Sequence, residues 1–363
     1  MDRSDIQELR NRIDDIDREI LDLLNKRMTV SEQIGVLKAQ IGRDVIDTTR
    51  EGQILRKLVS MNTGPLPEKT LRGIYREIFS GSRAVQSPVT VAFLGPEGTY
   101  THEAALERFG HSASYIPCSN VAEVFREVEQ AGSRFGVVPV ENSIEGSVRA
   151  TLDELMASSV GACGEISLQI SHALVNRSGK LEDVRKVVSH PQALAQCRRW
   201  LAARLPGISL EEASSTAVAA EQAMKDPSTA AVANERVSVR LGLQVVRRGI
   251  QDRSENITRF LVLGSLSPDP TGRDKTSIVF WTEDRPGSLF KILEKFAAYE
   301  LNLSRILSRP DPGAMPWKYA FFVDLEGHRD DPKVAKCLKE LATRDTMVKI
   351  LGSFPIHSLP SRE

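Results

Sequence analysis

Hydrophobic residues recur at alternating steps of three and four between residues 6 and 41. They are Ile6, Leu9, Ile13, Ile16, Ile20, Leu23, Val30, Ile34, Leu37 and Ile41, and no proline interrupts them. This spacing predicts one amphipathic helix, roughly 54 Å long at about 1.5 Å per residue. Shorter helices are expected at 48–62, with Asp47 as N-cap, and at 67–86. These two cannot cover so long an apolar stripe, so we expect an obligate dimer through this segment.

After residue 88 the pattern changes to short β-rich runs that alternate with helical stretches. Strands are expected at 89–94, 134–138, 166–175, 186–189, 230–233, 243–247 and 258–263. Strands separated by helices favour mostly parallel sheets covered on both faces. Their number favours two α/β lobes with a cleft between them. Residues 265–272 contain prolines, serines and a glycine, which is typical of a linker.

The last segment has the order βαββαβ, the split βαβ arrangement. Its strands are expected at 276–281, 302–307, 319–325 and 347–354, and its helices at 288–299 and 332–343. The chain is therefore predicted to be multidomain. It would comprise an all-α segment at 1–87, a two-lobed α/β domain at 88–267 and a small α+β domain at 273–363.

Composition narrows the class of partner. The 48 basic and 48 acidic residues cancel, which gives no reason to expect nucleic acid or a membrane as partner. Four scattered cysteines suggest neither a disulfide framework nor a zinc site, and no metal is expected. The start of the chain lacks the apolar core of a signal peptide, and no run approaches membrane-spanning length. We expect a cytoplasmic protein with a small ligand.

Charged residues of the first helix share a face. Arg27 and Lys38 are eleven residues apart, within roughly 20° on the helix, with Ser31 and Ile34 between them. Arg10 lies about 100° round from Arg27 and could serve a neighbouring subunit's site. Taken singly, each of these residues is more often a solvated surface charge.

The full set of such residues resembles the active-site pattern of the helical chorismate mutase family. It consists of Arg10, Arg27, Lys38, Asp47, Arg50, Glu51, Ser82 and Gln86. The resemblance implies rearrangement of chorismate to prephenate, without a cofactor, in a crossed dimer.

Roles follow from the same resemblance. Lys38 and Gln86 would be catalytic, stabilising the charge that develops on the ether oxygen. Arg10 and Arg27 would hold the two carboxylates in the compact conformation. Asp47 and Glu51 would orient the ring hydroxyl, whereas Arg50 and Ser82 would line the pocket.

Three strand-to-helix junctions, at 95–101, 139–147 and 189–192, carry hydroxyl or amide side chains beside unpaired N–H groups. That combination can hold a carboxylate, and plain helix capping is an equally weighted alternative. His102 is more simply explained as a structural residue than as a metal ligand, and His190 as a structural residue rather than a catalytic base.

Together with Asn256-Ile257-Thr258-Arg259-Phe260, these junctions resemble prephenate dehydratases across residues 89 to 267. The resemblance implies a periplasmic-binding-protein-like fold that needs neither metal nor organic cofactor. Thr258 and Arg259 would be catalytic, Thr258 by donating a hydrogen bond to the departing hydroxyl and Arg259 by holding a carboxylate. The implied substrate-binding set is Thr99, Thr101, Asn142, Ser143, Ser189, Gln196, Thr258, Arg259 and Phe260.

Two short motifs in the last segment resemble those by which ACT domains bind phenylalanine at a dimer interface. They are Gly287-Ser288-Leu289-Phe290 and Ser308-Arg309-Pro310. The chain departs from the family at Leu307, where glutamate is usual, and at Ser288, where alanine is common. Feedback inhibition by phenylalanine is expected, with dimerisation alone as the alternative.

The order of the three segments resembles the bifunctional P-proteins of phenylalanine biosynthesis. Chorismate and prephenate are then the expected substrates of a homodimer or higher homo-oligomer. A dehydratase that prefers arogenate is one alternative. A regulator that senses a carboxylate without catalysis is another, although the complete catalytic sets argue against it.

Overall fold

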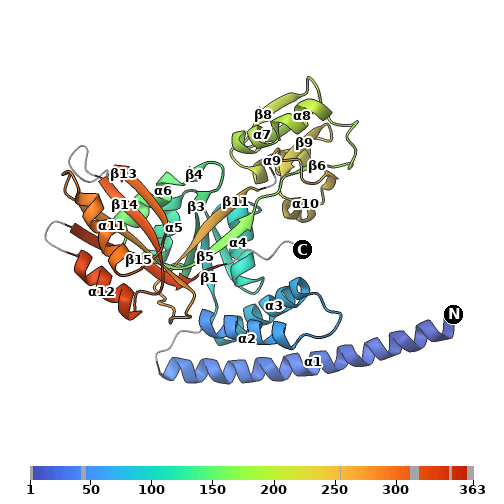
Figure 1. The fold of residues 1–363 in the computed structure, drawn as a ribbon. Helices are drawn as coiled ribbons and strands as arrows, with labels where there is room; N and C mark the ends of the chain where they lie inside the picture. Colours follow the sequence, from blue (N-terminus) through green and yellow to red (C-terminus); the bar gives the residue numbers. More distant parts are fainter. Residues whose placement is uncertain (1–2, 42–45, 254, 311–318, 343–345, 358–363) are drawn as a thin grey trace. The chain divides into compact units, whose positions relative to one another are not determined.

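The computed structural model describes residues 3–41, 46–253, 255–310, 319–342 and 346–357. These divide into two compact units, shown in Figure 1. Met1–Val89 with Phe109–Ser114 form the first, which we call the helical unit. Thr90–Arg108 with Tyr115–Glu363 form the second, which we call the main unit.

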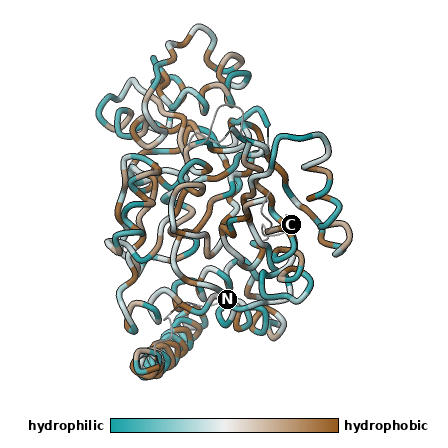
Figure 2. Tube along the Cα trace, turned by 90° about the vertical axis from the view of Figure 1, so that its left-hand side faces the viewer, coloured by the Kyte–Doolittle hydropathy of each residue, from teal (hydrophilic) through white to brown (hydrophobic). Residues whose placement is uncertain are grey.

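The helices of the helical unit are α1 (Arg3–Gln40), α2 (Thr48–Met61) and α3 (Glu68–Gln86). They confirm the predicted helices to within three residues at each described end. The Asp47 carboxylate accepts a hydrogen bond from the Arg50 N–H at 2.8 Å, so the predicted N-cap is also confirmed. Along α1 hydrophobic positions recur between hydrophilic ones (Figure 2), yet Ile13 and Ile16 remain 56% and 54% exposed. The apolar stripe is uncovered in a single chain.

The first sheet of the main unit, sheet A, has the order β2-β1-β3-β11-β5, with β4 paired to β3. Its strands are β1 (Thr90–Leu94), β2 (Ser114–Cys118), β3 (Phe135–Asn142), β4 (Gly146–Ser147), β5 (Ala162–Gln169) and β11 (Ile257–Leu263). The helices that connect these strands are α4 (Tyr100–Phe109), α5 (Val121–Glu129) and α6 (Arg149–Ala157).

The second sheet, sheet B, has the order β10-β6-β9-β7-β8. Its strands are β6 (Ala173–Asn176), β7 (Lys186–Ser189), β8 (Ser209–Glu212), β9 (Thr229–Ala233) and β10 (Gln244–Arg247). They alternate with the helices α7 (Pro191–Gln196), α8 (Arg198–Arg204), α9 (Thr216–Lys225) and α10 (Glu235–Leu241). Sheets A and B are the two predicted lobes.

The third sheet, sheet C, has the order β13-β14-β12-β15 and is antiparallel throughout. It contains β12 (Asp274–Thr282), β13 (Leu303–Pro310), β14 (Tyr319–Glu326) and β15 (Thr346–Pro355), with helices α11 (Ser288–Ala298) and α12 (Pro332–Leu341). The predicted βαββαβ order is confirmed; Thr343, the expected end of the last helix, lies outside the described residues.

The prediction of mostly parallel sheets is wrong, because sheets A and B are mixed. β11 returns to sheet A after the chain has built sheet B, and it pairs antiparallel with both β3 and β5. The run predicted as one strand at 166–175 divides into β5 and β6 of different sheets, so residues 170–172 pass between the lobes. The alternation of apolar and polar residues from 166 to 171 continues past the end of β5, so no local pattern marks the break.

One hydrophobic core joins sheet A to sheet C. Val138 and Leu261 from sheet A lie in the same buried cluster as Phe322 and Phe354 from sheet C. The segment at 265–272 therefore does not separate two independently packed cores. No helix in the described part of the chain is both long enough and apolar enough to cross a membrane.

Candidate active sites

In the helical unit, the last turn of α3 lies directly against the charged face of α1. The Arg27 guanidinium donates a hydrogen bond to the Ser82 hydroxyl and lies 5.7 Å from the centre of the Phe79 ring. The Gln86 amide donates to the Ser82 carbonyl at 2.8 Å. Lys38 is half-buried on the same side of α1. Arg27, Ser82 and Gln86 of the predicted set are thus brought together.

Gly35 makes this close approach possible, and the sequence analysis missed it. A Cβ at Gly35 would lie 2.8 Å from the Gln86 Cγ, too near for any side chain. The Gln86 Oε1 is buried and has no hydrogen-bond partner among the described residues. A buried polar atom without a partner is costly, so the amide has capacity for a ligand.

Glu51 has a partner that the sequence did not indicate. Both of its carboxylate oxygens accept hydrogen bonds from the Arg83 Nη1, at 2.8 and 2.9 Å. Arg83 is 4% exposed and also donates to the Phe109 carbonyl of the same unit at 2.8 Å. By contrast, Arg10 and Arg50 are exposed. The helical unit therefore holds part of the predicted set in place and leaves part of it open.

In the main unit, a chain of hydrogen-bonded amides extends from Thr258. The Asn142 Nδ2 donates to the Thr258 hydroxyl oxygen at 2.8 Å and to the Asn256 Oδ1 at 2.7 Å. The Asn256 amide in turn donates to the Gln196 Oε1 at 2.8 Å. We call these four residues the Thr258 cluster. They come from sheet A, from α7 and from the segment between the lobes, so the cluster forms only in the folded unit.

Two further residues support the cluster from behind. His172 contacts the Gln196 Oε1 through its Nε2 at 3.0 Å, and the Tyr100 hydroxyl lies 3.0 Å from its Nδ1. Burial lowers the pKa of His172, although the hydrogen bond to Gln196 opposes that effect. Burial raises the pKa of Tyr100 well above its ordinary value. Both groups are therefore neutral near pH 7; His172 contacts the Gln196 carbonyl directly, and Tyr100 holds the His172 ring from its other side.

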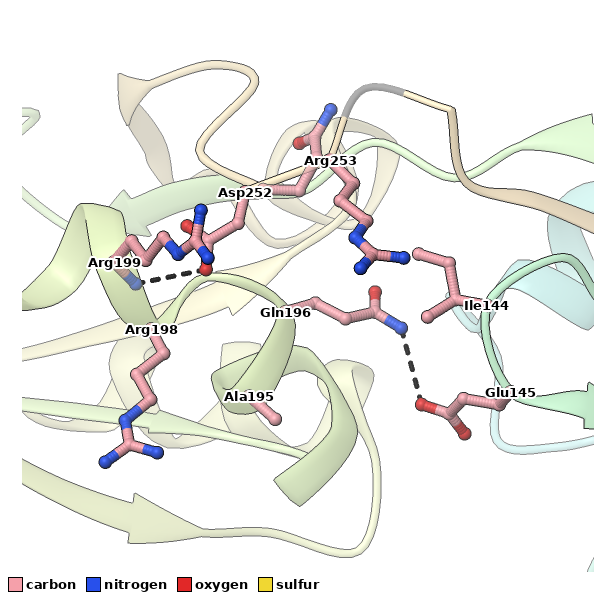
Figure 3. Close-up of a pocket in the computed structure, with 9 residues that line it drawn as sticks. Ile144, Glu145, Ala195, Gln196, Arg198, Arg199, Asp252 and Arg253 are labelled. Carbon is pink, nitrogen blue, oxygen red and sulfur yellow. Dashed lines mark hydrogen bonds between the residues drawn. The ribbon is translucent and has the colours of Figure 1, made fainter.

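A cavity of about 460 Å³ opens beside Gln196 (Figure 3). Ile144 and Glu145 line it from the β3–β4 hairpin, and Gln196 donates to the Glu145 carboxylate at 3.4 Å. The Arg253 guanidinium lies between Ile144 and Gln196, whereas the guanidinium of Arg198, another lining residue, extends away from Gln196 (Figure 3). A small ligand there meets amide groups and a cation.

Arg259 does not join this site. Its Nη1 lies 2.7 Å from the Asp324 carboxylate of sheet C, and Glu141 and Glu165 lie 3.5 and 3.7 Å from the guanidinium. Burial alone would lower the pKa of Arg259, but Asp324 and the other two carboxylates raise it. Successive residues of a strand point to opposite faces, so the neighbour of Thr258 faces away from it. The implied role of Arg259 in holding substrate does not fit this arrangement.

Other predicted residues of the dehydratase set have local structural bonds. The Ser189 hydroxyl is fully buried and donates to the Val232 carbonyl at 2.6 Å inside sheet B. The Thr99 hydroxyl bonds to carbonyls of its own loop, Thr101 is buried at the start of α4, and Phe260 is 1% exposed in the core. Ser143 ties the β3–β4 turn to β11 by accepting the Ile257 N–H at 3.0 Å.

The two histidines considered structural behave so. The His102 Nδ1 accepts the Gly98 N–H at 3.0 Å, and its ring stacks on Phe93. The His190 Nδ1 accepts the Gln192 N–H at 3.3 Å and caps α7. At these two junctions, each histidine side chain thus accepts a hydrogen bond from a backbone N–H.

The fold and these clusters define a multidomain enzyme with a helical catalytic segment, a two-lobed α/β cleft and a βαββαβ domain. Family models match in the same order: chorismate mutase type II at residues 9–87, prephenate dehydratase at 91–268 and the ACT domain at 276–343.

Similar proteins agree with that order. A bifunctional chorismate mutase/prephenate dehydratase of Aquifex aeolicus is 45% identical over 97% of this chain and 98% of its own length. One from Neisseria gonorrhoeae is 40% identical over 95% of this chain and 96% of its own. A solved prephenate dehydratase of Arthrobacter aurescens, in complex with L-Phe, superposes with a TM-score of 0.68 at 37% identity, covering 74% of this chain and 90% of that one. The chain belongs to the bifunctional chorismate mutase/prephenate dehydratases and carries both catalytic domains of that family.

Proposed function

We propose that the helical unit rearranges chorismate to prephenate at the α1–α3 contact, and that the main unit converts prephenate to phenylpyruvate, carbon dioxide and water at the Thr258 cluster. In the first reaction, Arg27 binds a carboxylate while Lys38 and Gln86 stabilise the charge that develops on the ether oxygen. The packing of Gln86 against Gly35 and the hydrogen bond from Arg27 to Ser82 support this, because they fix these groups before substrate arrives.

Arg10 serves the site of a second copy of the chain. It lies seventeen residues before Arg27 on a continuous helix, roughly 26 Å away at about 1.5 Å per residue. No side chain spans that distance, so Arg10 reaches such a site only from another subunit. A homodimer would also cover the exposed stripe of α1. The most exposed large apolar residues of that helix include Leu9, Ile13, Leu21, Leu23, Val36 and Leu37.

In the dehydratase reaction Thr258 assists departure of the ring hydroxyl. Its oxygen accepts the Asn142 amide, so its own proton is available to a ligand. A threonine hydroxyl is too weak an acid to ionise near neutral pH, and hydrogen-bond donation to the leaving oxygen is the step that it can perform. Loss of carbon dioxide with water then yields an aromatic ring, which supplies much of the driving force.

Arg253 is the cation that binds a carboxylate of prephenate. Arg259, which the resemblance implied for this role, is ion-paired with Asp324 on the other face of β11. The Arg253 guanidinium instead points into the cavity lined by Glu145 and Gln196 (Figure 3). A charge-assisted hydrogen bond from this position would orient the carboxylate beside the cluster.

Prephenate is the preferred substrate over arogenate, because the mutase on the same chain produces prephenate. The four cysteines are free and buried, which suits the reducing cytoplasm in which we place the protein.

Phenylalanine inhibits the dehydratase through the ACT domain. Gly287 has φ of +84° and precedes α11, and Phe290 is 66% exposed. Along β13, Ile306 and Ser308 are exposed, whereas Leu307 packs on the shared core. Leu307, where the family usually has glutamate, thus lies on the opposite face of the strand from Ser308. The departure from the family pattern therefore removes no group from the exposed face. The L-Phe complex of the Arthrobacter relative supports this effector.

One assay tests these proposals. Purified protein is incubated with chorismate, and chorismate loss and phenylpyruvate formation are followed with and without phenylalanine. Phenylpyruvate formation, slowed by phenylalanine, is the expected result. Accumulation of prephenate alone would indicate that the dehydratase prefers arogenate. Arogenate would then be added to the protein as the substrate to test this. No loss of chorismate would contradict the mutase assignment.

A further inference from the structure

A buried cluster of charges lies between sheet A and sheet C, directly behind the dehydratase site. Arg259 of β11 is paired with Asp324 of β14 at 2.7 Å, and Lys275 of β12 with Glu165 of β5 at 2.9 Å. The side chains of Asp324 and Glu165 are only 4% and 2% exposed. Charges so deeply buried are costly unless each is paired, so the two sheets are held in a specific relation.

The β3–β4 hairpin is held by the same domain. Arg305 of β13 donates to the Ser147 hydroxyl at 2.6 Å, and its Nε lies 3.3 Å from the Glu141 carboxylate. Ser147 and Glu141 are cross-strand partners in that hairpin. The turn of the hairpin carries Glu145, which lines the cavity. An arginine of the ACT domain therefore fixes the base of a loop of the catalytic cleft.

The residues that contact sheet C are the sequence neighbours of the residues that face the cleft. In the β3–β11 ladder Thr258 pairs with Asn142, and Arg259 pairs with Glu141. Thr258 and Asn142 face the cleft, whereas Arg259 and Glu141 face sheet C. The ladder register also shifts immediately after Arg259.

The electrostatics keep these pairs ionised. Burial would raise the pKa of Asp324, but Arg259 and the Ser277 hydroxyl lower it overall. Burial lowers the pKa of Arg305, which Asp324 and Glu141 oppose. Both pairs therefore act as charge pairs near neutral pH.

We propose that Asp324 and Arg305 are positioning residues of the dehydratase: they act through Arg259 and Glu141 to set the placement of Thr258 against Asn142 from behind sheet A. The proposal rests on the catalytic role proposed for Thr258. It makes the ACT domain a structural part of the active site.

Strand β13 carries both Arg305 and the motif at 308–310 that we expect to bind phenylalanine. Arg305, Leu307 and Arg309 alternate along its inner face, and Arg309 is paired with Asp153 of α6 at 2.6 Å. Ser308 and Pro310 of the motif lie on the outer face. A ligand that shifts β13 therefore moves Arg305, and with it the hairpin and Asn142.

The test uses the full-length chain, with Asp324→Asn and Arg305→Gln as variants. Glu300→Gln is the matched control, because it removes an exposed ion pair of the same domain, to Lys333, that lies away from sheet A. We expect dehydratase kcat to fall on the order of tenfold in both variants, because small misplacements of reacting groups are costly, while KM changes little. The concentration of phenylalanine that halves activity should also shift by at least about fivefold. Mutase activity on the same chain should stay at the control level.

Conservative replacements separate positioning from mere stability. Arg305→Lys retains a cation beside Glu141 and should recover most of kcat. If Asp324→Asn also lowers the melting temperature of the main unit, Arg305→Gln decides, because it leaves the Arg259–Asp324 pair intact. Wild-type kcat and phenylalanine response in Arg305→Gln would overturn the proposal. The role of Thr258 is tested separately by Thr258→Ala. If Thr258→Ala loses dehydratase turnover while Arg305→Gln keeps wild-type turnover, the role of Thr258 stands and only the positioning role of Asp324 and Arg305 is overturned.

Discussion

The two units prepare their sites in different ways. In the main unit, Asn142, Asn256, Gln196 and Thr258 are joined by hydrogen bonds of 2.7–2.8 Å within one chain. In the helical unit, the expected cation Arg10 is exposed far along α1 from the rest of its set. One chain therefore assembles the Thr258 cluster, whereas in the mutase site that we propose Arg10 would come from a second copy of the chain.

The units also differ in what their buried arginines do. Arg83 neutralises Glu51, a predicted substrate residue of the same unit. Arg259 ties the catalytic strand to the ACT domain through Asp324. In both units an arginine with little exposure fixes the framework, whereas Arg10 and Arg253, two of the cations that we propose to meet substrate, are exposed.

The largest expected effect comes from Thr258→Ala. Without its hydroxyl the site cannot assist departure of the leaving oxygen, so dehydratase kcat should fall by about 10²–10⁴-fold, the usual contribution of positioned proton donors. Mutase turnover should be unchanged, which provides an internal control for folding. Thr258→Ser keeps a hydroxyl and should retain much of the activity. Full dehydratase turnover in Thr258→Ala would refute the assignment.

Mixing two inactive mutase variants tests the need for a second copy. Arg10→Ala and Lys38→Ala should each be inactive alone, because every site then lacks a required cation. When they are refolded together in equal amounts, about a quarter of wild-type activity should return, since half of the dimers are mixed and each has one intact site.

A matched pair of variants provides the control for this experiment. Lys38→Ala mixed with Gln86→Ala should restore nothing, because both residues serve the site of their own chain and every site keeps one defect. Recovery in that mixture, or none in the first, would refute the shared site.

The sequence was most informative where hydrophobic periodicity is strong. The helices of the helical unit and the βαββαβ order follow from apolar spacing, and Asp47 caps α2 as its side chain suggests. Strand β8 was missed because its residues are exposed and carry no apolar alternation. The direction of β11 was missed because a strand's orientation depends on where the chain re-enters the sheet, which no local pattern records.

The structure brings some of the predicted site residues together and separates others. Thr258 and Arg259 are adjacent in the printed sequence, yet the strand sends them to opposite faces. Arg83 and Glu51 are far apart in the chain, and no spacing rule indicates their pairing. Gly35 carried a weak signal, a glycine inside a long helix, which often marks close packing.

Arg253→Leu sharpens the contrast between framework and substrate cations, with a smaller effect. Loss of one charge-assisted hydrogen bond, of about 1.5–3 kcal/mol, should raise KM for prephenate roughly tenfold or more. Arg198→Leu is the control, because this arginine lines the same cavity but its guanidinium extends away from Gln196 and Glu145 (Figure 3). Equal KM values in the two variants would mean that Arg253 does not bind the substrate.

The smallest effect concerns pH and His172. Because burial lowers its pKa below 6.5, the unfolded chain takes up a proton at this residue before the folded chain does. The free energy of unfolding of the main unit should therefore be highest above pH 6.5 and fall as the pH drops through the lowered pKa. His172→Gln should remove this part of the dependence. His357, whose pKa is lowered by burial and by Arg108, remains in both proteins and cancels in their difference. Thermal unfolding of the two proteins from about pH 5 to 8 measures that difference, and a difference that stays constant with pH would contradict the prediction.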